Sequence, residues 1–307
     1  MKGPPLLPAC AMAPGCYLSR AMRPGRAFGR RGRAGTGILG SYDSGAVIGR
    51  AVGSVPRETP VVIVDNASPE GIGFMAGLPR AAELVALPRN LGFGTACNAG
   101  ARAATTPYLL FLNPDAELEA GALDRLLAAA ALYGPGFLMP AIVGENGRLM
   151  RKEGSILEPV PRARRLKEEE IAGDYCTRFV HGAAVMVARD LFLAMGGFDE
   201  KIFLYHEDDD LALRALARKL PIIVVRAARV RHGGGKSSTP RLSRTFAINR
   251  RKKQSELYVR RKYGHPVPRW RDAVTLASGC ALALATFDFH RVAIRAGKLR
   301  ALFDPPA

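Results

Sequence analysis

Four carboxylates stand side by side in the stretch FLYHEDDDLALR, from Glu207 to Asp210. If a helix begins near Glu207, the positive end of its dipole relieves part of the repulsion between these charges. Acids are common at a helix start, but four in a row exceed what capping requires. Burial would raise the pKa of any of them, which is a property of groups that accept or donate protons in active sites.

Helical spacing over residues 208–219 would set the directions of these side chains. Residues three apart share a helix face, so Glu207 goes with Asp210, whereas Asp208 and Asp209 project elsewhere. We expect Asp209 to be a solvated first-turn residue and Asp210 to fix the helix start. The same spacing predicts a buried stripe of Leu213, Leu216 and Leu220.

Other polar residues follow short apolar runs that are typical of strands. Asp65 ends VVIVD, Asn113 and Asp115 follow YLLFL, and His232 comes after the last apolar run. One or two carboxylates at such a position, with substrate phosphates and water, can hold Mg²⁺ or Mn²⁺. Each residue also has a plain structural interpretation: an Asx-turn for Asp65, a helix start for Asp115, and a packing role for a lone histidine.

The segment NLGFGTACNAG (Asn90–Gly100) has glycines and asparagines at a strand-to-helix turn, where a helix N-terminus favours phosphate. It is a weak match to a dinucleotide fingerprint, since Cys97 replaces the third glycine. Close packing of the helix on the sheet explains its small residues almost as well.

Strands and helices alternate along the chain, which predicts an α/β protein with a mostly parallel sheet covered on both faces. In such sheets ligands bind at the carboxyl ends of strands. The expected strands are 61–65, 83–87, 108–112, 137–143, 183–189 and 221–225; the expected helices are 94–104, 120–133 and 208–219; and 151–174 is expected to be a long loop.

The net charge of +18 is unevenly distributed over the 307 residues. Residues 1–37 carry +7 and residues 241–307 carry +11, so the middle of the chain is neutral. We expect 1–37 to be a disordered basic tail or a mis-assigned start, 38–240 to be the folded domain, and 241–307 to be a basic helical extension. Basic ends around a neutral domain suit an anionic membrane surface better than nucleic acid.

Two further features bear on location. The five cysteines are scattered, which argues against a disulfide framework or a zinc site and favours a reducing cytosol. The apolar run Ala273–Phe287 is too short to span a bilayer, and it leaves two alternatives open: a buried helix, or a helix lying at a bilayer surface.

Six motifs in order resemble those of the inverting family 2 glycosyltransferases with a GT-A fold, in particular the rhamnosyltransferase-like branch. They span about residues 40–238 and read SYDSGAVI, VVIVDNAS, NLGFGTACNAG, LNPDAEL, GGFDEKIFLYHEDDDLALR and VRHGGG. The resemblance implies the nucleotide-diphospho-sugar transferase (GT-A) fold, with a mostly parallel central sheet flanked by helices and, here, a basic helical extension.

The resemblance also implies roles for individual residues. Asp208 would be the catalytic base and Glu207 would help to place the acceptor. The metal–diphosphate would be held by Asp115 and His232. Donor and acceptor would be contacted by the turn His181, Gly182 and Ala183. Nucleotide binding would fall to Tyr42, Asp43, Asp65, Asn90, Gly92 and Asn98.

The implied activity is metal-dependent transfer of a sugar, with inversion, from a nucleoside-diphosphate sugar to a glycan or lipid-linked acceptor in bacterial envelope polysaccharide synthesis. The implied cofactor is Mg²⁺ or Mn²⁺, and the implied location is the cytoplasm or the inner face of the cell membrane. One departure stands out: RGRAGTGILG is a poor candidate for the family's central first strand. A missing strand would impair donor binding, so a catalytically impaired protein that binds partners at the membrane is the alternative.

Overall fold

The computed structural model describes residues 34–152, 154–157, 171, 173–233, 241–266 and 268–305. Most of the basic segment 1–37 and much of the expected loop 151–174 therefore lie outside the described residues. The elements follow one another as β1 (Gly35–Ser41), α1 (Gly45–Ser54), β2 (Val61–Asp65), η2 (Gly73–Gly77), β3 (Glu83–Ala86), α2 (Phe93–Ala103), β4 (Tyr108–Leu112), β5 (Ala116–Leu118), α3 (Ala122–Tyr133), β6 (Phe137–Gly144), β7 (Tyr175–Cys176), β8 (Ala184–Ala188), α4 (Arg189–Ala194), α5 (Glu207–Ala217), β9 (Ile222–His232), α6 (Leu242–Lys262), α7 (Arg269–Ala285) and α8 (Phe289–Ala301).

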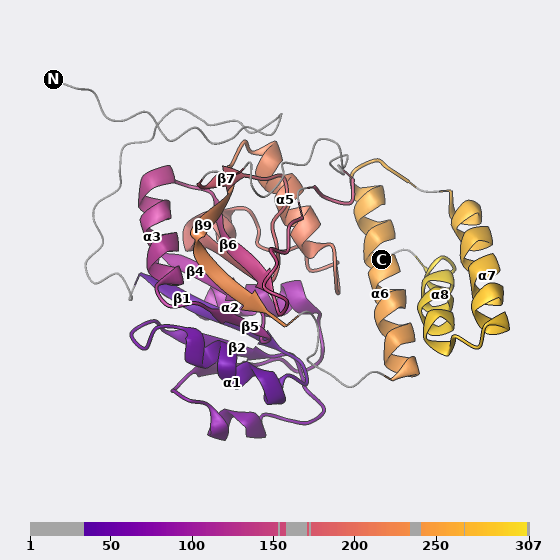
Figure 1. The fold of residues 1–307 in the computed structure, drawn as a ribbon, viewed down its shortest axis with the longest axis horizontal. Coiled ribbons are helices and arrows are strands. Elements are labelled where there is room, and N and C mark those ends of the chain that lie inside the picture. Colours follow the sequence, from indigo (N-terminus) through magenta and orange to yellow (C-terminus); the bar gives the residue numbers. More distant parts are fainter. Residues whose placement is uncertain are drawn as a thin grey trace.

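A single mixed sheet forms the centre of the protein, with strand order β3-β2-β1-β4-β8-β6-β9-β5 and β7 paired to β9. The strands β3, β2, β1 and β4 run parallel, and β8 runs antiparallel to both β4 and β6. Helices cover both faces of this sheet (Figure 1). This is the α/β architecture that the alternation of apolar runs predicts.

The doubtful first strand is present, so of the two alternatives that the sequence left open, a poor strand that is tolerated and a strand that is missing, the structure shows the first. β1 lies between β2 and β4, paired in parallel with both. Ile38 and Leu39 are fully buried, and the small residues around them fit where neighbours come close. A Cβ added at Gly37 would meet the side chains of Val55 and Val61. Hydrogen bonds on both edges and burial on both faces outweigh the low strand propensity of glycine here.

Two apolar layers sandwich the sheet, one on each face. On the face carrying α2 and α4, the rings of Phe111, Phe192 and Phe198 pack against one another, with centroids 4.8 to 5.4 Å apart. Phe198 begins the loop that leads to α5. The core therefore extends directly under the acidic stretch.

The basic extension folds into three helices, with α8 packed against both α6 and α7 (Figure 1). Asp304 accepts hydrogen bonds from Arg250 and from Gln254, which ties the end of α8 to α6. No helix in the described part of the chain is both long enough and apolar enough to cross a membrane. Of the described cysteines, Cys97 and Cys280 are free, whereas Cys176 is disulfide-bonded.

Candidate active site

The sheet topology brings the separate polar motifs to one edge. The parallel strands β2 and β4 end there at Asp65 and Leu112. Antiparallel β8 starts at the same edge, because Ala184 pairs with Leu112. The strand β9 ends there at His232, opposite Ala116. The sequence expectation that strand ends would assemble the site therefore matches the topology, although β9 is longer than predicted and contains His232.

The acidic stretch forms the first turn of α5, preceded by two strained residues. Tyr205 and His206 both have left-handed backbones, with φ of 63° and 68°. Such conformations cost energy in residues other than glycine and are concentrated at functional sites. They let the loop before α5 turn sharply, so that the helix N-terminus faces the carboxyl edge of the sheet.

Helix α2 holds the loop before α5 in place through Gly92 and Asn98. Gly92 has φ of 93°, and an added Cβ would lie 2.1 Å from the Phe203 carbonyl oxygen, so only glycine fits. The Asn98 amide is buried; it donates to the Phe198 carbonyl and to Glu200, and its oxygen accepts from the Phe198 N–H. In this structure Asn98 thus supports the loop, and its predicted contact with nucleotide stays a prediction.

Glu207 and Asp208 occupy different environments despite being adjacent. Glu207 is buried, and its Oε2 has no hydrogen-bond partner among the described residues. Burial and the neighbouring Asp208 raise the pKa of Glu207 to about 8. Asp208 is half-buried beside the 181–183 turn, since a Cβ added at Gly182 would lie 3.7 Å from Asp208 Oδ2. Burial raises the pKa of Asp208 as well, and the positive charge of Lys152 opposes that rise.

Asp209 is not the solvated residue that helical periodicity predicts. It is 1% exposed, and its carboxylate accepts from the Ile156 N–H and contacts His206 Nδ1 at 2.8 Å and Lys152 Nζ at 3.4 Å. Burial would raise the pKa of Asp209, but these partners lower it overall. The reason is tertiary: Ile156 and Lys152, from a distant part of the chain, supply partners for this carboxylate beside the neighbouring His206.

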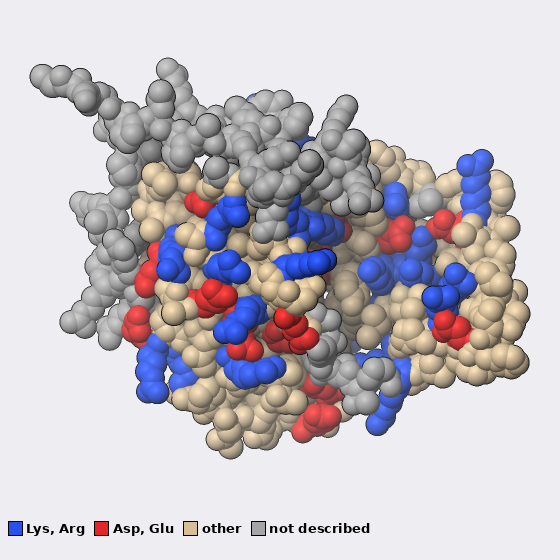
Figure 2. All heavy atoms as spheres, in the orientation of Figure 1, with Lys and Arg blue, Asp and Glu red and all other residues tan. Residues whose placement is uncertain are grey.

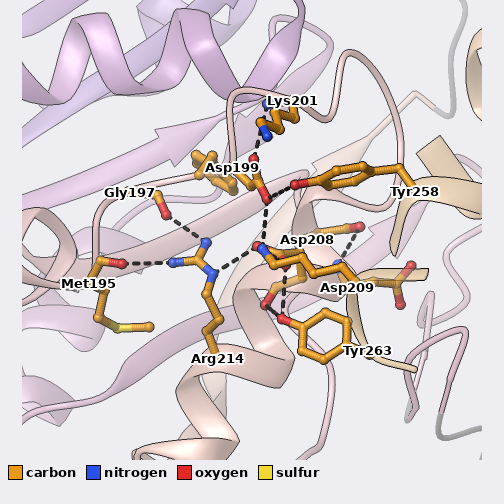
Figure 3. A network of polar contacts seen from close by, with 12 residues as sticks. Met195, Gly197, Asp199, Lys201, Asp208, Asp209, Arg214, Tyr258 and Tyr263 are labelled. Carbon is orange, nitrogen blue, oxygen red and sulfur yellow. Dashed lines mark hydrogen bonds and ion pairs between the residues drawn. The ribbon is translucent and has the colours of Figure 1, made fainter. Parts of the chain in front are cut away.

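Asp210 fixes α5 to the C-terminal helices. It is fully buried; its Oδ2 accepts from Arg214 Nε at 2.8 Å, and its Oδ1 accepts from Lys262 Nζ at 2.6 Å and Tyr263 OH at 2.9 Å. Figure 3 shows Arg214 reaching from α5 to the Met195 and Gly197 carbonyls. The expected structural role of Asp210 is confirmed, and α6 proves to be part of the site's frame.

A second contact ties α6 to the loop before α5. Tyr258 OH and Lys262 Nζ both donate to Asp199 Oδ2, at 2.9 and 2.7 Å (Figure 3). Although burial raises the pKa of Asp199, these hydrogen bonds lower it overall. The Ser255 hydroxyl donates to the Leu204 carbonyl in the same loop. The predicted stripe of Leu213, Leu216 and Leu220 is correct only in part: all three are half-buried, and Leu216 and Leu220 pack against the core. The fully buried apolar residues of α5 are Leu211, Ala212 and Ala215.

Asp115 and His232 lie together at the sheet edge. Asp115 Oδ1 is 3.2 Å from His232 Nε2, and neither ring nitrogen of His232 makes a hydrogen bond to a described residue. Nδ1 of His232 is buried without a partner among the described residues and Nε2 faces the Asp115 carboxylate, an arrangement that could take up a cation between the two side chains. A carboxylate oxygen suits Mg²⁺ and Mn²⁺, and an imidazole nitrogen is a ligand of transition metals. The described residues contain no cluster of three or more metal-binding side chains, so substrate oxygens would have to complete the coordination.

His181 lies between this pair and the side of the edge where Gly182 borders Asp208. Its ring meets that of His232 edge to face, with centroids 6.2 Å apart. The Ala183 N–H donates to His181 Nδ1 at 3.2 Å, so the proton of the neutral ring lies on Nε2. Burial, together with the nearby His232 and Lys152, lowers the pKa of His181 to about 4 and keeps it neutral.

The residues predicted to bind nucleotide are held by hydrogen bonds within the protein. The Asp65 carboxylate accepts from the Ser68 hydroxyl at 2.6 Å and the Ser68 N–H at 3.2 Å, as in the turn expected from the plain interpretation. The Asp43 N–H donates to the same hydroxyl, and Tyr42 is exposed beside it. These contacts place the residues near one another at the edge, and their binding role stays a prediction.

Asn90 is held by a residue that the sequence did not single out. Asn66 Nδ2 donates to Asn90 Oδ1 at 2.9 Å, and Asn66 Oδ1 accepts from the Leu91 N–H. Asn90 Oδ1 also accepts from the Gly92 N–H. The position of Asn66 directly after Asp65 was the sequence feature that could have identified it. Lys152 was missed as well, because the loop that carries it has no readable pattern.

The sequence is similar to two mycobacterial proteins. It is 29% identical over 188 residues to the N-acetylglucosaminyl-diphospho-decaprenol L-rhamnosyltransferase of Mycobacterium tuberculosis (strain ATCC 25618 / H37Rv). That match covers 52% of this chain and 61% of the relative, so the chain spans about three-fifths of the relative's length. It is also 31% identical over 97 residues to an uncharacterized glycosyltransferase of Mycobacterium bovis, covering 32% of this chain and 44% of that protein.

Solved structures share the fold at low sequence identity. A mannosyltransferase from Pyrobaculum calidifontis in complex with GDP-Man and Mn²⁺ superposes with a TM-score of 0.52 at 20% identity, covering 88% of this chain and 87% of that one. Residues 1–349 of S. aureus TarS with UDP-GlcNAc give a TM-score of 0.51 at 14% identity, covering 87% and 91%. These likenesses show a GT-A-like α/β fold. The model of the family "Glycosyl transferase family 2" matches residues 38–193, half of the chain, and the protein belongs to that family.

Proposed function

We propose that the protein transfers a sugar from a nucleoside-diphosphate sugar to a hydroxyl of a glycan or lipid-linked acceptor, with inversion at the anomeric carbon. The observation that carries the proposal is the continuous arrangement at the sheet edge. Asp115 and His232 lie together, His181 contacts His232, and Gly182 borders Asp208. A place for a metal–diphosphate thus stands next to a carboxylate that can accept a proton.

Asp208 is the base in this proposal. It is the more accessible of the two adjacent acids, and its raised pKa makes it a stronger base than an ordinary aspartate. The acceptor oxygen forms a bond to the anomeric carbon as the bond to the diphosphate oxygen breaks. The acceptor proton passes to the Asp208 carboxylate, and the bonding electron pair leaves with the nucleoside diphosphate.

The other residues bind and orient. Asp115 and His232 would hold Mg²⁺ or Mn²⁺, which neutralises charge growing on the leaving diphosphate. Neutral His181 can donate from Nε2 on the donor side without repelling the cation. Glu207, protonated near pH 7 because its pKa is about 8, can donate a hydrogen bond to the acceptor without competing for its proton.

The name of the mycobacterial relative supports a rhamnosyl donor and a polyprenyl-diphosphate-linked acceptor, and therefore a role in envelope polysaccharide synthesis at the inner face of the membrane. The alternative of a catalytically impaired binding protein rested on a missing first strand. Because β1 is formed and buried, that reason no longer applies.

The test has two parts. A thermal-shift screen of sugar nucleotides with and without Mn²⁺ identifies the donor, and Asp208→Asn is then assayed with that donor. We expect Asp208→Asn to abolish transfer while nucleotide affinity stays within about twofold. Near-normal turnover by this variant would move the base elsewhere, and a folded wild-type protein that binds no sugar nucleotide would refute the proposed function itself.

A further inference from the structure

Helix α7 presents an uncharged, apolar face to solvent. The fifteen residues of Ala273–Phe287 include no charged side chain. Within α7, every residue of which is described, Ala283 is the one buried residue, and Val274 and Leu282 are each 64% exposed. An exposed apolar surface of this extent is uncommon in a soluble protein and marks a binding surface.

Aromatic residues stand at both ends of this face. Trp270 in the first turn is 66% exposed, and Phe287, in the turn to α8, is 78% exposed with a left-handed backbone of φ 54°. Phe289, which begins α8, is 54% exposed. Tryptophan and other aromatics at the ends of an apolar segment are typical of elements that sit at the level of lipid headgroups.

Basic residues flank the apolar face at both ends. Arg269 and Arg271 lie in the first turn of α7, and Arg291 follows the α7–α8 turn. In Figure 2 the surface over α7 is almost entirely tan, with blue side chains at the end where the helix begins. Arginine beside an apolar face can reach lipid phosphates while the face enters the acyl boundary.

The net charge of the whole extension indicates which kind of partner could cover the apolar face of α7. Residues 241–307 contain fifteen basic and four acidic residues, and each of these acids is engaged by lysine or arginine. A second copy of this chain would bring the same positive charge against it, which opposes association. An anionic lipid surface is complementary to both the charge and the apolar face.

We propose that the α7–α8 hairpin docks on an anionic lipid surface, with α7 lying in the plane of the interface. Its seventeen residues amount to about 25 Å of helix, and the exposed face runs along that length. Docking of this kind is independent of sugar transfer and extends the proposed function with a dedicated membrane-binding element. It also orients the catalytic domain, because α8 packs on α6, which holds α5 through Asp210.

The experiment is co-sedimentation of the full chain with two kinds of vesicle, pure phosphatidylcholine and phosphatidylcholine mixed with phosphatidylglycerol. We expect binding to the mixed vesicles that weakens with salt, and little binding to the neutral ones. Leu282→Glu and Phe287→Asn should each lower the partition coefficient by about tenfold or more. The matched control is Leu132→Glu on α3, where the leucine is also exposed, and it should bind as the wild type does.

Two results would overturn the proposal: a wild-type chain that ignores anionic vesicles, or Leu282→Glu and Phe287→Asn variants that bind them as tightly as the wild type. Sedimentation velocity tests the competing possibility, that a second copy of the chain binds this face. A wild-type dimer that Leu282→Glu dissociates, without vesicle binding, would assign this face to a second copy. Far-ultraviolet circular dichroism checks that the variants are folded, and vesicle binding is read without any sugar donor, so failure of the proposed function leaves this test intact.

Discussion

Tyr263 and Lys262, at the end of α6, are predicted to act on catalysis through Asp210. Both donate to Asp210 Oδ1, two residues beyond the proposed base Asp208 in the same helical turn. Burial and Asp210 raise the pKa of the Tyr263 hydroxyl, so it remains a donor across the working pH range. Removing this hydroxyl takes away one of the hydrogen bonds that a fully buried carboxylate accepts.

The expected loss of stability depends on how many donors to Asp210 remain in each variant. A hydrogen bond to a charged group contributes about 1.5–3 kcal/mol. Tyr263→Phe leaves Lys262 and Arg214 in place, so we expect a loss of stability at the lower end, about 1.5 kcal/mol. Lys262→Met removes one of the two cations that contact this buried carboxylate and should cost more, about 3 kcal/mol, because a charge is lost as well as a hydrogen bond. Arg214 and the partial exposure of Lys262 keep the cost from being larger.

The assay separates positioning from stability. A small displacement of a catalytic group can cost orders of magnitude in rate, so we expect kcat to fall about tenfold in Tyr263→Phe and more in Lys262→Met, with nucleotide affinity unchanged. Release of nucleoside diphosphate from the identified donor measures kcat. The matched control is Tyr258→Phe, which removes a 2.9 Å hydrogen bond from the same helix to Asp199 but leaves all donors to Asp210.

The control should lose similar stability and keep kcat within about twofold. Equal loss of kcat in Tyr258→Phe and Tyr263→Phe would show that α6 acts only through general stability. Unchanged kcat in a destabilised Tyr263→Phe would show that Asp210 does not position the base.

Three further predictions concern charge at the site. Lys152→Met should move the acid limb of the kcat/KM profile to higher pH, since Lys152 favours the charged form of Asp208. The control Lys152→Arg should leave that limb in place. An unmoved limb in Lys152→Met would exclude this coupling between Lys152 and Asp208. Glu207 holds its proton to about pH 8 when folded but only to about 4.5 when unfolded, so it lowers the free energy of unfolding as pH rises between these values. Glu207→Gln should therefore flatten that dependence in denaturant titrations, and an unchanged slope would contradict the assignment. His232→Ala should weaken Mn²⁺-dependent binding of nucleoside diphosphate at least tenfold by calorimetry while metal-free binding persists; equal loss in both conditions would point to misfolding.

Parts of the site were readable from sequence because local pattern determines them. Strands that end in acids, with helices between them, predicted both the α/β sheet and the edge along which Asp65, Asp115 and His232 all lie. Parallel strands must end at a common edge, and that constraint does not depend on packing detail. Asp210 was also predicted correctly as a structural residue.

Other features depended on contacts between distant segments. Asp209 is buried with partners that include Ile156 and Lys152 from a distant segment, and the strand β1 forms because two neighbours pair with it. The most buried apolar residues of α5, Leu211, Ala212 and Ala215, also have helical spacing, and which part of the helix surface is most buried was decided by its packing in the core cluster that includes Phe198.

The sequence by itself determined the alternation of elements, the placement of the acids at strand ends, and the neutral domain with basic ends. Only the tertiary structure decided which of the four adjacent acids is buried, which is paired and which lies beside the 181–183 turn. Burial, the hydrogen bonds from α6 and the nearby Lys152 separate the environments of Glu207, Asp208, Asp209 and Asp210. Side chains that are neighbours in sequence acquire different proton affinities because low-dielectric surroundings and opposite charges act over distances that only the fold sets.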